Sequence, residues 1–311
     1  MNVIKSIPWL SYLALAAAMA VVGAYVGFSK ALVIVFPIFV LAWMRFAIAA
    51  VAMAPWLRRP AGEAPLDGRT RGLLFLESFF GNFLFSVCML FGISHSSALA
   101  AGVIMAAIPA VVALLSWLIL GERVRWRVAL GIACAIAGIA LVALARDDEG
   151  ELASGSLLGS ALLLGAVTCE AIYVVLGKKL SARVGPKRIS AFINLWGLAL
   201  VTPFAIWQLP GFTFGFIPTS SWVLLVVYAI AASVLTVWLW MTGLKHVPAS
   251  SASVFTVFLP ISAAAVGVFV FGETFTAAQA GAFALALVGV VLASFPDRAR
   301  RAGGAMPAPL N

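Results

Sequence analysis

The sequence predicts an all-α, polytopic membrane protein with ten transmembrane helices arranged as two inverted five-helix repeats. Three observations support this fold: the hydrophobic composition, an internal repeat and the distribution of basic residues. Of the 311 residues, 64% are hydrophobic and 10% are charged, and the mean hydropathy is +1.12. A soluble core cannot bury so much apolar surface, so the chain is expected to lie in a lipid bilayer.

Ten apolar stretches are long enough to cross the hydrocarbon layer, which takes about 20 residues of helix. They lie at about 8–28, 37–57, 72–92, 97–120, 128–145, 156–177, 188–209, 220–243, 248–271 and 277–295. The alternating patterns and turn clusters of an outer-membrane barrel are missing from the sequence. The stretch after Lys5 resembles a signal peptide, but another apolar stretch follows it, so we interpret it as the first span.

One segment of the sequence occurs twice without gaps, 151 positions apart. Residues 92–143 and 243–294 are identical at 14 of 52 positions. The most telling matches are Gly92 and Gly243, His95 and His246, Pro109 and Pro260, Gly121 and Gly272, Glu122 and Glu273, and Gly138 and Gly289. We therefore predict one five-helix repeat at 1–147, and a second repeat with a short basic tail at 148–311.

Basic residues indicate the orientation of the helices, because Lys and Arg resist translocation. With a cytoplasmic N-terminus, seventeen of the 20 Lys and Arg residues fall on the cytoplasmic side and two on the opposite side, with Arg45 inside the second span. This predicts a multi-pass protein of the bacterial inner membrane with both termini in the cytoplasm. Because each repeat has an odd number of helices, the second must be inverted. The net charge of +9 is then an orientation signal rather than a nucleic-acid footprint.

Two prolines lie near the predicted middle of the bilayer. Pro109 and Pro260 each follow about twelve residues of a predicted span. A proline removes a backbone hydrogen bond and disturbs the helix around it. We expect this pair to line a cavity or to act as hinges, and the alternative is a packing kink satisfied by neighbouring helices.

These features resemble the EamA-type branch of the drug/metabolite transporter superfamily. The resemblance rests on the mid-helix Pro, the Gly-Glu pair and the Gly-rich helix in both halves, together with Trp43-Met44-Arg45-Phe46. The chain departs from the family where Tyr25 and Tyr173 lie in stretches without the usual tryptophan, and where Asn194 replaces Arg45 in the second half. Membership implies metabolite export by alternating access, and among the subgroups the aromatic amino-acid exporters come first.

Ionisable residues inside the predicted spans are functional candidates, because such residues are costly there. Glu170 either forms an ion pair with Arg45, or binds a substrate ammonium group or takes up a proton. Glu77 is expected at the membrane interface, paired with Arg69 or Arg71. For Glu273 and its repeat mate, a turn-forming or packing role is expected.

Polar and aromatic side chains at helical spacing predict the faces that line a substrate cavity. The predicted substrate-binding residues are Phe79, Asn82, Ser86, Glu170, Tyr173, Ser233, Thr236, Trp240, Ser253 and Thr256. The alternative is helix packing, which small hydroxyl residues also serve in membranes.

Enzyme motifs, nucleotide-binding loops and paired cysteines are missing from the sequence, so neither a metal site nor a cofactor is predicted. The predicted function is a secondary transporter that moves a small organic metabolite outward across the cytoplasmic membrane by alternating access. The metabolite is expected to be an amino acid, with an aromatic one favoured, or a related solute. A membrane-embedded enzyme acting on a lipid or small amphiphile is the alternative. The expected partners are the small-molecule substrate and the lipid bilayer, and not nucleic acid. Small residues in spans 5 and 10 suit helix contacts within the monomer or across a homodimer.

Overall fold

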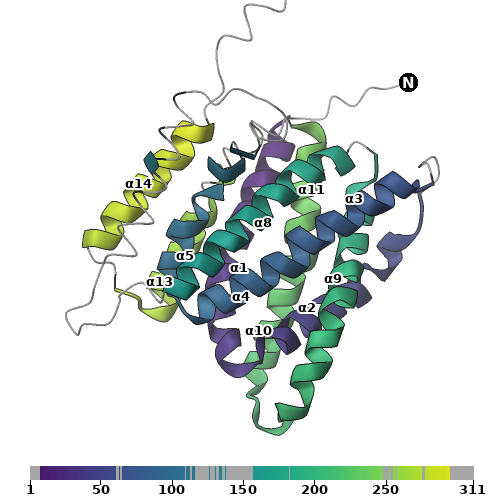
Figure 1. Ribbon diagram of the computed structural model, residues 1–311, viewed down its shortest axis with the longest axis horizontal. Helices are drawn as coiled ribbons and strands as arrows, with labels where there is room; N and C mark the ends of the chain where they lie inside the picture. Colours follow the sequence, from purple (N-terminus) through teal and green to yellow (C-terminus); the bar gives the residue numbers. More distant parts are fainter. Residues whose placement is uncertain are drawn as a thin grey trace, which may run out of the picture.

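Six long apolar helices dominate the computed structural model (Figure 1). The structure describes residues 8–60, 63, 65–108, 110–112, 114–115, 126, 130, 133–134, 137, 157–181, 183–247, 252, 255–256, 258–274 and 277–294. The six helices of membrane-spanning length in this part of the chain are Trp9–Val35, Ile38–Leu57, Gly68–Ser94, Leu157–Ser181, Pro186–Gly211 and Thr219–His246. The protein is therefore an all-helical membrane protein, as the composition predicts.

Several of these spans are built from more than one element. The spans of the first half are α1 (Pro8–Val35), α2 (Ile38–Met53) with η1 (Ala54–Leu57), and α3 (Gly68–Ser78) followed by η2 (Phe79–Leu84) and α4 (Phe85–Ser94). Those of the second half are α8 (Leu157–Ser181), α9 (Pro186–Gln208) with η3 (Leu209–Gly211), and α10 (Thr219–Ala229) followed by η5 (Ile230–Leu235) and α11 (Thr236–His246). The short η4 (Phe214–Phe216) precedes α10.

Three shorter helices occupy predicted spans 4, 9 and 10. They are α5 (Ala98–Met105), α13 (Phe258–Phe271) and α14 (Ala277–Ser294), the last lying at one flank of the bundle (Figure 1). Nearly all of predicted span 5, at 128–145, lies outside the described residues, as do Gly121, Glu122 and Gly138. The ten-helix count therefore stays a prediction.

Local sequence signals explain where several helices begin and end. The side chain of Asp67 caps α3 by accepting a hydrogen bond of 2.9 Å from the backbone N–H of Thr70, and Ser97 caps α5 in the same way. Hydrogen bonding from Thr70 also lowers the pKa of Asp67 below its ordinary value. Pro186 opens α9, and Gly272, with a φ of 65°, follows the end of α13.

The first helix is longer than the hydropathy pattern predicts. It continues to Val35 instead of ending near residue 28, so Lys30 lies within α1. The charge is tolerated because Lys30 Nζ lies 2.8 Å from Glu273 Oε1. The same oxygen accepts a hydrogen bond of 3.0 Å from Ala98 N at the start of α5. Glu273, which follows α13, therefore joins that helix to α1 and α5 of the other half.

Two π-helical segments mark the repeat in the structure. The segment η2 interrupts the third span and η5 interrupts the span Thr219–His246. Both segments are six residues long, and they start at residues 79 and 230, so they differ by the same 151 positions as the repeated sequence. A π-turn places an extra residue in a helix and is frequent at functional sites.

The first helices of the two halves run in opposite directions. Leu15, near the start of α1, packs against Gly243 near the end of α11, where an added Cβ would lie 2.5 Å from the leucine Cγ. Lys178, near the end of α8, donates hydrogen bonds of 2.7 and 3.0 Å to the carbonyl oxygens of Leu244 and Val247. The start of α1 and the end of α8 therefore meet the same end of α11.

The two halves interlock, because each first helix packs against the other half. Helix α1 packs most extensively on α13 and α11, while α8 packs on α4 and α5, and α2 packs on α9. Lipid tails are as apolar as these side chains, so association of the helices depends on close packing rather than on removal from water. Small residues at the contacts permit that packing, and the tightest case is Gly23, where an added Cβ would lie 2.1 Å from the carbonyl oxygen of Leu259.

Replacing Gly23 with Ala is expected to force α1 and α13 apart. Overpacking of this kind costs about 1–3 kcal/mol, so the apparent melting temperature in detergent should fall. Gly72→Ala is the matched control, because nothing lies within 4 Å of a Cβ added there and Ala is a better helix former than Gly. Melting curves followed by tryptophan fluorescence test the expectation, and equal melting temperatures for the two variants would contradict the close contact.

Candidate functional site

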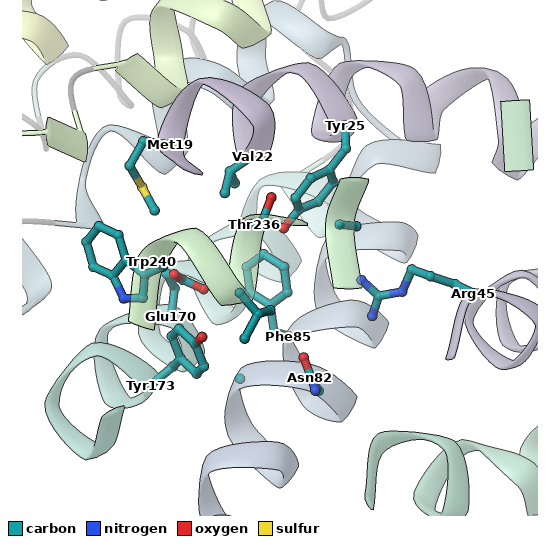
Figure 2. Close-up of a pocket in the computed structure, with 13 residues that line it drawn as sticks. Met19, Val22, Tyr25, Arg45, Asn82, Phe85, Glu170, Tyr173, Thr236 and Trp240 are labelled. Carbon is teal, nitrogen blue, oxygen red and sulfur yellow. The ribbon is translucent and has the colours of Figure 1, made fainter. Parts of the chain in front are cut away.

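A small cavity lies where helices of both halves meet (Figure 2). Its volume is about 30 Å³, which leaves room for roughly one or two water molecules and not for a metabolite. The cavity is lined by Met19, Val22, Tyr25, Arg45, Gly81, Asn82, Phe85, Glu170, Tyr173, Ala232, Thr236, Val237 and Trp240. The central cavity is therefore too small to hold a metabolite in this conformation.

The π-helical segments shape two parts of the cavity wall. Gly81 of η2 meets the ring of Tyr173 on α8, where an added Cβ would lie 2.2 Å from the ring carbon Cδ2. On the other side, Tyr25 of α1 packs edge-on against Tyr228, which lies two residues before η5, with 5.8 Å between ring centroids. Ala232 of η5 completes that part of the wall. Each first helix thus presents a tyrosine to the opposite half.

Arg45 is the cation of the cavity. It is buried on α2, and its Nη2 donates a hydrogen bond of 2.5 Å to Ser86 Oγ, which in turn donates to the carbonyl oxygen of Asn82. The guanidinium carbon lies 4.2 Å from the ring centroid of Phe46 and 5.9 Å from that of Tyr228, both within cation–π range. These contacts hold the guanidinium group in place while it faces the cavity.

Glu170 lies on the opposite side of the cavity from Arg45 (Figure 2). Both residues line the same space, yet within the described residues no ion pair joins them. The ion pair that the sequence allowed as an alternative is therefore not present in this conformation. The cavity instead has a guanidinium group in one wall and a carboxyl group in the other.

Besides Arg45 Nε, two polar atoms of residues in the cavity wall have no hydrogen-bond partner among the described residues. They are Trp240 Nε1 and Thr236 Oγ1, and both side chains are buried, with Trp240 only 1% exposed. Leaving a buried polar group unsatisfied costs about 1–3 kcal/mol, so such groups normally meet water or a ligand. Their position in the wall makes this side of the cavity suited to hydrogen bonding with a bound molecule.

Half of the residues expected to bind substrate line the cavity. They are Asn82, Glu170, Tyr173, Thr236 and Trp240. Ser86 and Ser233 are buried but do not line it: Ser86 bonds to Arg45, and the Ser233 hydroxyl has no partner among the described residues.

Phe79 does not lie in the cavity wall of this conformation. Its ring packs with Phe75, Phe80 and Phe83 in an aromatic cluster. The expected single stripe through Phe79 and Asn82 assumes regular α-helical spacing, and the π-helical segment η2 changes that spacing at this point.

The remaining expected residues lie away from the cavity or outside the described residues. Thr256 is buried but does not line the cavity. Pro260 is the third described residue of α13 and does not line the cavity; residues 253–254 and 257 before it lie outside the described residues, so its place in a longer helix stays a prediction. Pro109 and Ser253 lie outside the described residues.

One carboxylate, Glu77, does not lie where the sequence predicts. Instead of lying at the interface with Arg69 or Arg71, it is 0% exposed, and Arg71 Nε donates to the carbonyl oxygen of Leu66. The apolar residues that follow the capped start of α3 carry Glu77 about 15 Å into the bundle from Asp67, at ~1.5 Å per residue.

Comparison with known proteins now identifies the chain. Residues 9–144 and 157–295 each match the family described as "EamA-like transporter family". The chain belongs to the EamA-like transporter family. Because this family, within the drug/metabolite transporter superfamily, consists of transporters and not of enzymes, the enzyme alternative is excluded. The double match also shows the EamA domain occurring twice in tandem.

Proteins similar in sequence cover most of the chain. It is 32% identical over 254 residues to the "uncharacterized transporter YetK" of Bacillus subtilis, which covers 81% of this chain and 77% of that protein. It is 28% identical over 252 residues to an "uncharacterized transporter" of Archaeoglobus fulgidus, with 81% and 84% covered. A crystal structure matches with a TM-score of 0.62 and 17% identity over 94% of this chain and 99% of that chain, which shows the fold alone.

Proposed function

We propose that this EamA-family transporter moves a small zwitterionic metabolite outward across the bacterial inner membrane. The favoured substrate is an aromatic amino acid. The observation that carries this proposal is the placement of Arg45 and Glu170 on opposite walls of one cavity. Arg45 would bind the carboxylate of an amino acid and Glu170 its ammonium group.

The rest of the cavity wall supports an aromatic side chain. Tyr25, Phe85, Tyr173 and Trp240 contribute rings, and Met19 contributes a thioether. Aromatic pairs and sulfur–aromatic contacts add to simple apolar packing. The unpartnered Trp240 Nε1 offers a hydrogen bond to a polar group on the same molecule.

Alternating access between two inverted repeats is the mechanism that this geometry supports. The proposed repeats are 1–147 and 148–311 with five helices each, and the opposite directions of α1 and α8 are consistent with them. A cavity of about 30 Å³ must widen to admit an amino acid. We propose that Pro109 and Pro260 act as hinges in that movement, and that transport needs no cofactor. A homodimer is compatible with this mechanism but is not required, because the cavity is formed within one chain.

Counterflow in proteoliposomes tests the proposed substrate class. Vesicles loaded with unlabelled phenylalanine should take up labelled phenylalanine in a protein-dependent manner. Tyramine, which lacks the carboxylate, and 3-phenylpropionate, which lacks the ammonium group, should compete much more weakly than phenylalanine. If both singly charged compounds compete as well as phenylalanine, recognition of a zwitterion is excluded.

Cysteine labelling tests the proposed orientation. In a background without Cys88, Cys134 and Cys169, a cysteine at Thr274 should react in intact cells with a membrane-impermeant maleimide. A cysteine at Lys187 should react only after the cells are permeabilised, because it lies on the basic, cytoplasmic side. Labelling of position 274 only from the cytoplasm would contradict the inverted repeat.

A further inference from the structure

Glu77 is a buried carboxylate that does not line the cavity. It lies on α3 with 0% exposure, and neither carboxylate oxygen has a hydrogen-bond partner among the described residues. Its surroundings are tightly packed: a Cβ added at Gly177 of α8 would lie 2.8 Å from Glu77 Oε1 and 2.9 Å from Met241 Cε. A charge in such a place needs a compensating partner.

The described neighbours of Glu77 do not provide that partner. Helix α3 packs against α8 and α9. On α8, Glu170 and Tyr173 line the cavity, and neither side chain can supply a positive charge. Lys178 follows next to Gly177, but its ammonium group donates to two backbone carbonyls at the end of α11. On α9, Arg188 is bonded to a carboxylate in the loop before α3.

The position of Glu77 along α8 connects the cavity with one end of the bundle. Gly177, which touches Glu77, is seven residues from Glu170, a distance of roughly 10 Å along the helix. Lys178 marks the end of α8 that the charge distribution assigns to the cytoplasm. Glu77 therefore lies between that end and Glu170, which faces the cavity.

An isolated ionised carboxylate in a low-dielectric interior is strongly unfavourable, whereas binding one proton removes the charge. A dedicated cation partner would have made Glu77 a structural ion pair, like that of Arg188. Intramembrane carboxylates that lack such a partner are the groups that carry protons in transporters.

We propose that Glu77 is a proton-binding site that couples substrate export to a proton gradient. The inference rests on the proposed function, because it names the coupling ion of that transporter. In the cycle, one proton enters from outside through the open cavity, resides on Glu77 and leaves to the cytoplasm, while one zwitterionic substrate moves outward. Glu170 exchanges the proton for the ammonium group of the substrate. One net positive charge then moves inward per cycle.

Two assays with labelled phenylalanine separate coupling from binding. Wild-type proteoliposomes should show counterflow without a pH gradient and accumulation when a pH gradient is imposed. Glu77→Gln should keep counterflow near the wild-type rate and lose gradient-driven accumulation, whereas Glu77→Asp should retain part of both. Asp67→Asn, at an exposed carboxylate on the same helix, is the control and should behave as wild type. Gradient-driven accumulation by Glu77→Gln at the wild-type level would overturn the proposal, as would accumulation driven by Na⁺ instead of protons.

Infrared difference spectroscopy tests proton binding without any transport. Detergent-solubilised wild-type protein, compared between acidic and alkaline buffer, should show a carboxyl C=O band that is absent from Glu77→Gln and present in Glu170→Gln. Identical spectra for Glu77→Gln and the wild type would overturn the proposal. A wild-type protein without phenylalanine counterflow, but with the Glu77 band, would refute the proposed substrate and leave the proton site standing.

Discussion

Replacing Arg45 with Lys is expected to weaken amino-acid binding by roughly 10- to 100-fold, the range that a lost charge-assisted hydrogen bond corresponds to. Lysine keeps the positive charge but presents no planar fork for a carboxylate. It also cannot hold the same contacts with Ser86 and with the ring of Phe46. The measurement is the rise in apparent melting temperature with phenylalanine concentration, because a ligand that binds only the folded state stabilises it by mass action.

Arg188→Lys is the matched control for Arg45→Lys. Arg188 is buried and paired with Glu63 away from the cavity, so its replacement should lower stability without changing phenylalanine affinity. Arg45→Lys should bind 3-phenylpropionate more weakly than the wild type and leave tyramine binding nearly unchanged. Wild-type affinity for phenylalanine in Arg45→Lys would remove Arg45 from the binding site.

Glu170→Gln is expected to nearly abolish phenylalanine counterflow in a protein that remains folded. The glutamine keeps the shape of the side chain and loses the charge that attracts an ammonium group. Stability should stay close to that of the wild type, because no described ion pair is broken. Removing one member of a buried ion pair would instead cost about 3–5 kcal/mol. Melting curves and counterflow at several pH values distinguish a substrate-binding carboxylate from a member of a structural ion pair.

The double variant Arg45→Gln, Glu170→Gln serves as the control for an ion pair in another conformation. If Glu170→Gln is destabilised and the second substitution restores its stability, the two residues form a structural pair. If Glu170→Gln is stable and transports with an unchanged pH profile, the residue has no functional role. We expect neither of these two results. Instead, Glu170→Gln should be a stable protein that loses tyramine binding and keeps 3-phenylpropionate binding.

Composition and spacing predicted the parts of this molecule that depend on long, regular patterns. Apolar length alone predicted most ends of the six described spans to within a few residues. The repeated Gly, His and Pro matches predicted the two halves that the double family match also shows. Glu170, Tyr173 and Trp240 could be placed in the cavity because polar or aromatic residues recur at helical spacing around them.

The remaining features depend on contacts that one sequence does not display. Phe79 was assigned to the cavity because a regular α-helix was assumed, and the π-helical segment η2 invalidates that spacing. Glu77 was assigned to the interface because arginines lie nearby in the sequence, although the packing of α3 against α8 buries it. Tyr25 had a usable signal, since Tyr173 lies 148 positions later in the first helix of the other half, but that match alone did not say which residues it faces.

The matched π-helical segments also bear on the history of the chain. An inserted residue turned a regular helix into a π-turn either once, before the coding sequence was duplicated, or twice at equivalent positions. A single event is the simpler history, and it means that the common ancestor of the two copies already carried the distortion that now shapes the cavity. The two copies later diverged in sequence. At the shared offset of 151 positions, Glu77 corresponds to Tyr228, Asn82 to Ser233 and Phe85 to Thr236. The walls that the two copies contribute to the cavity are therefore no longer alike.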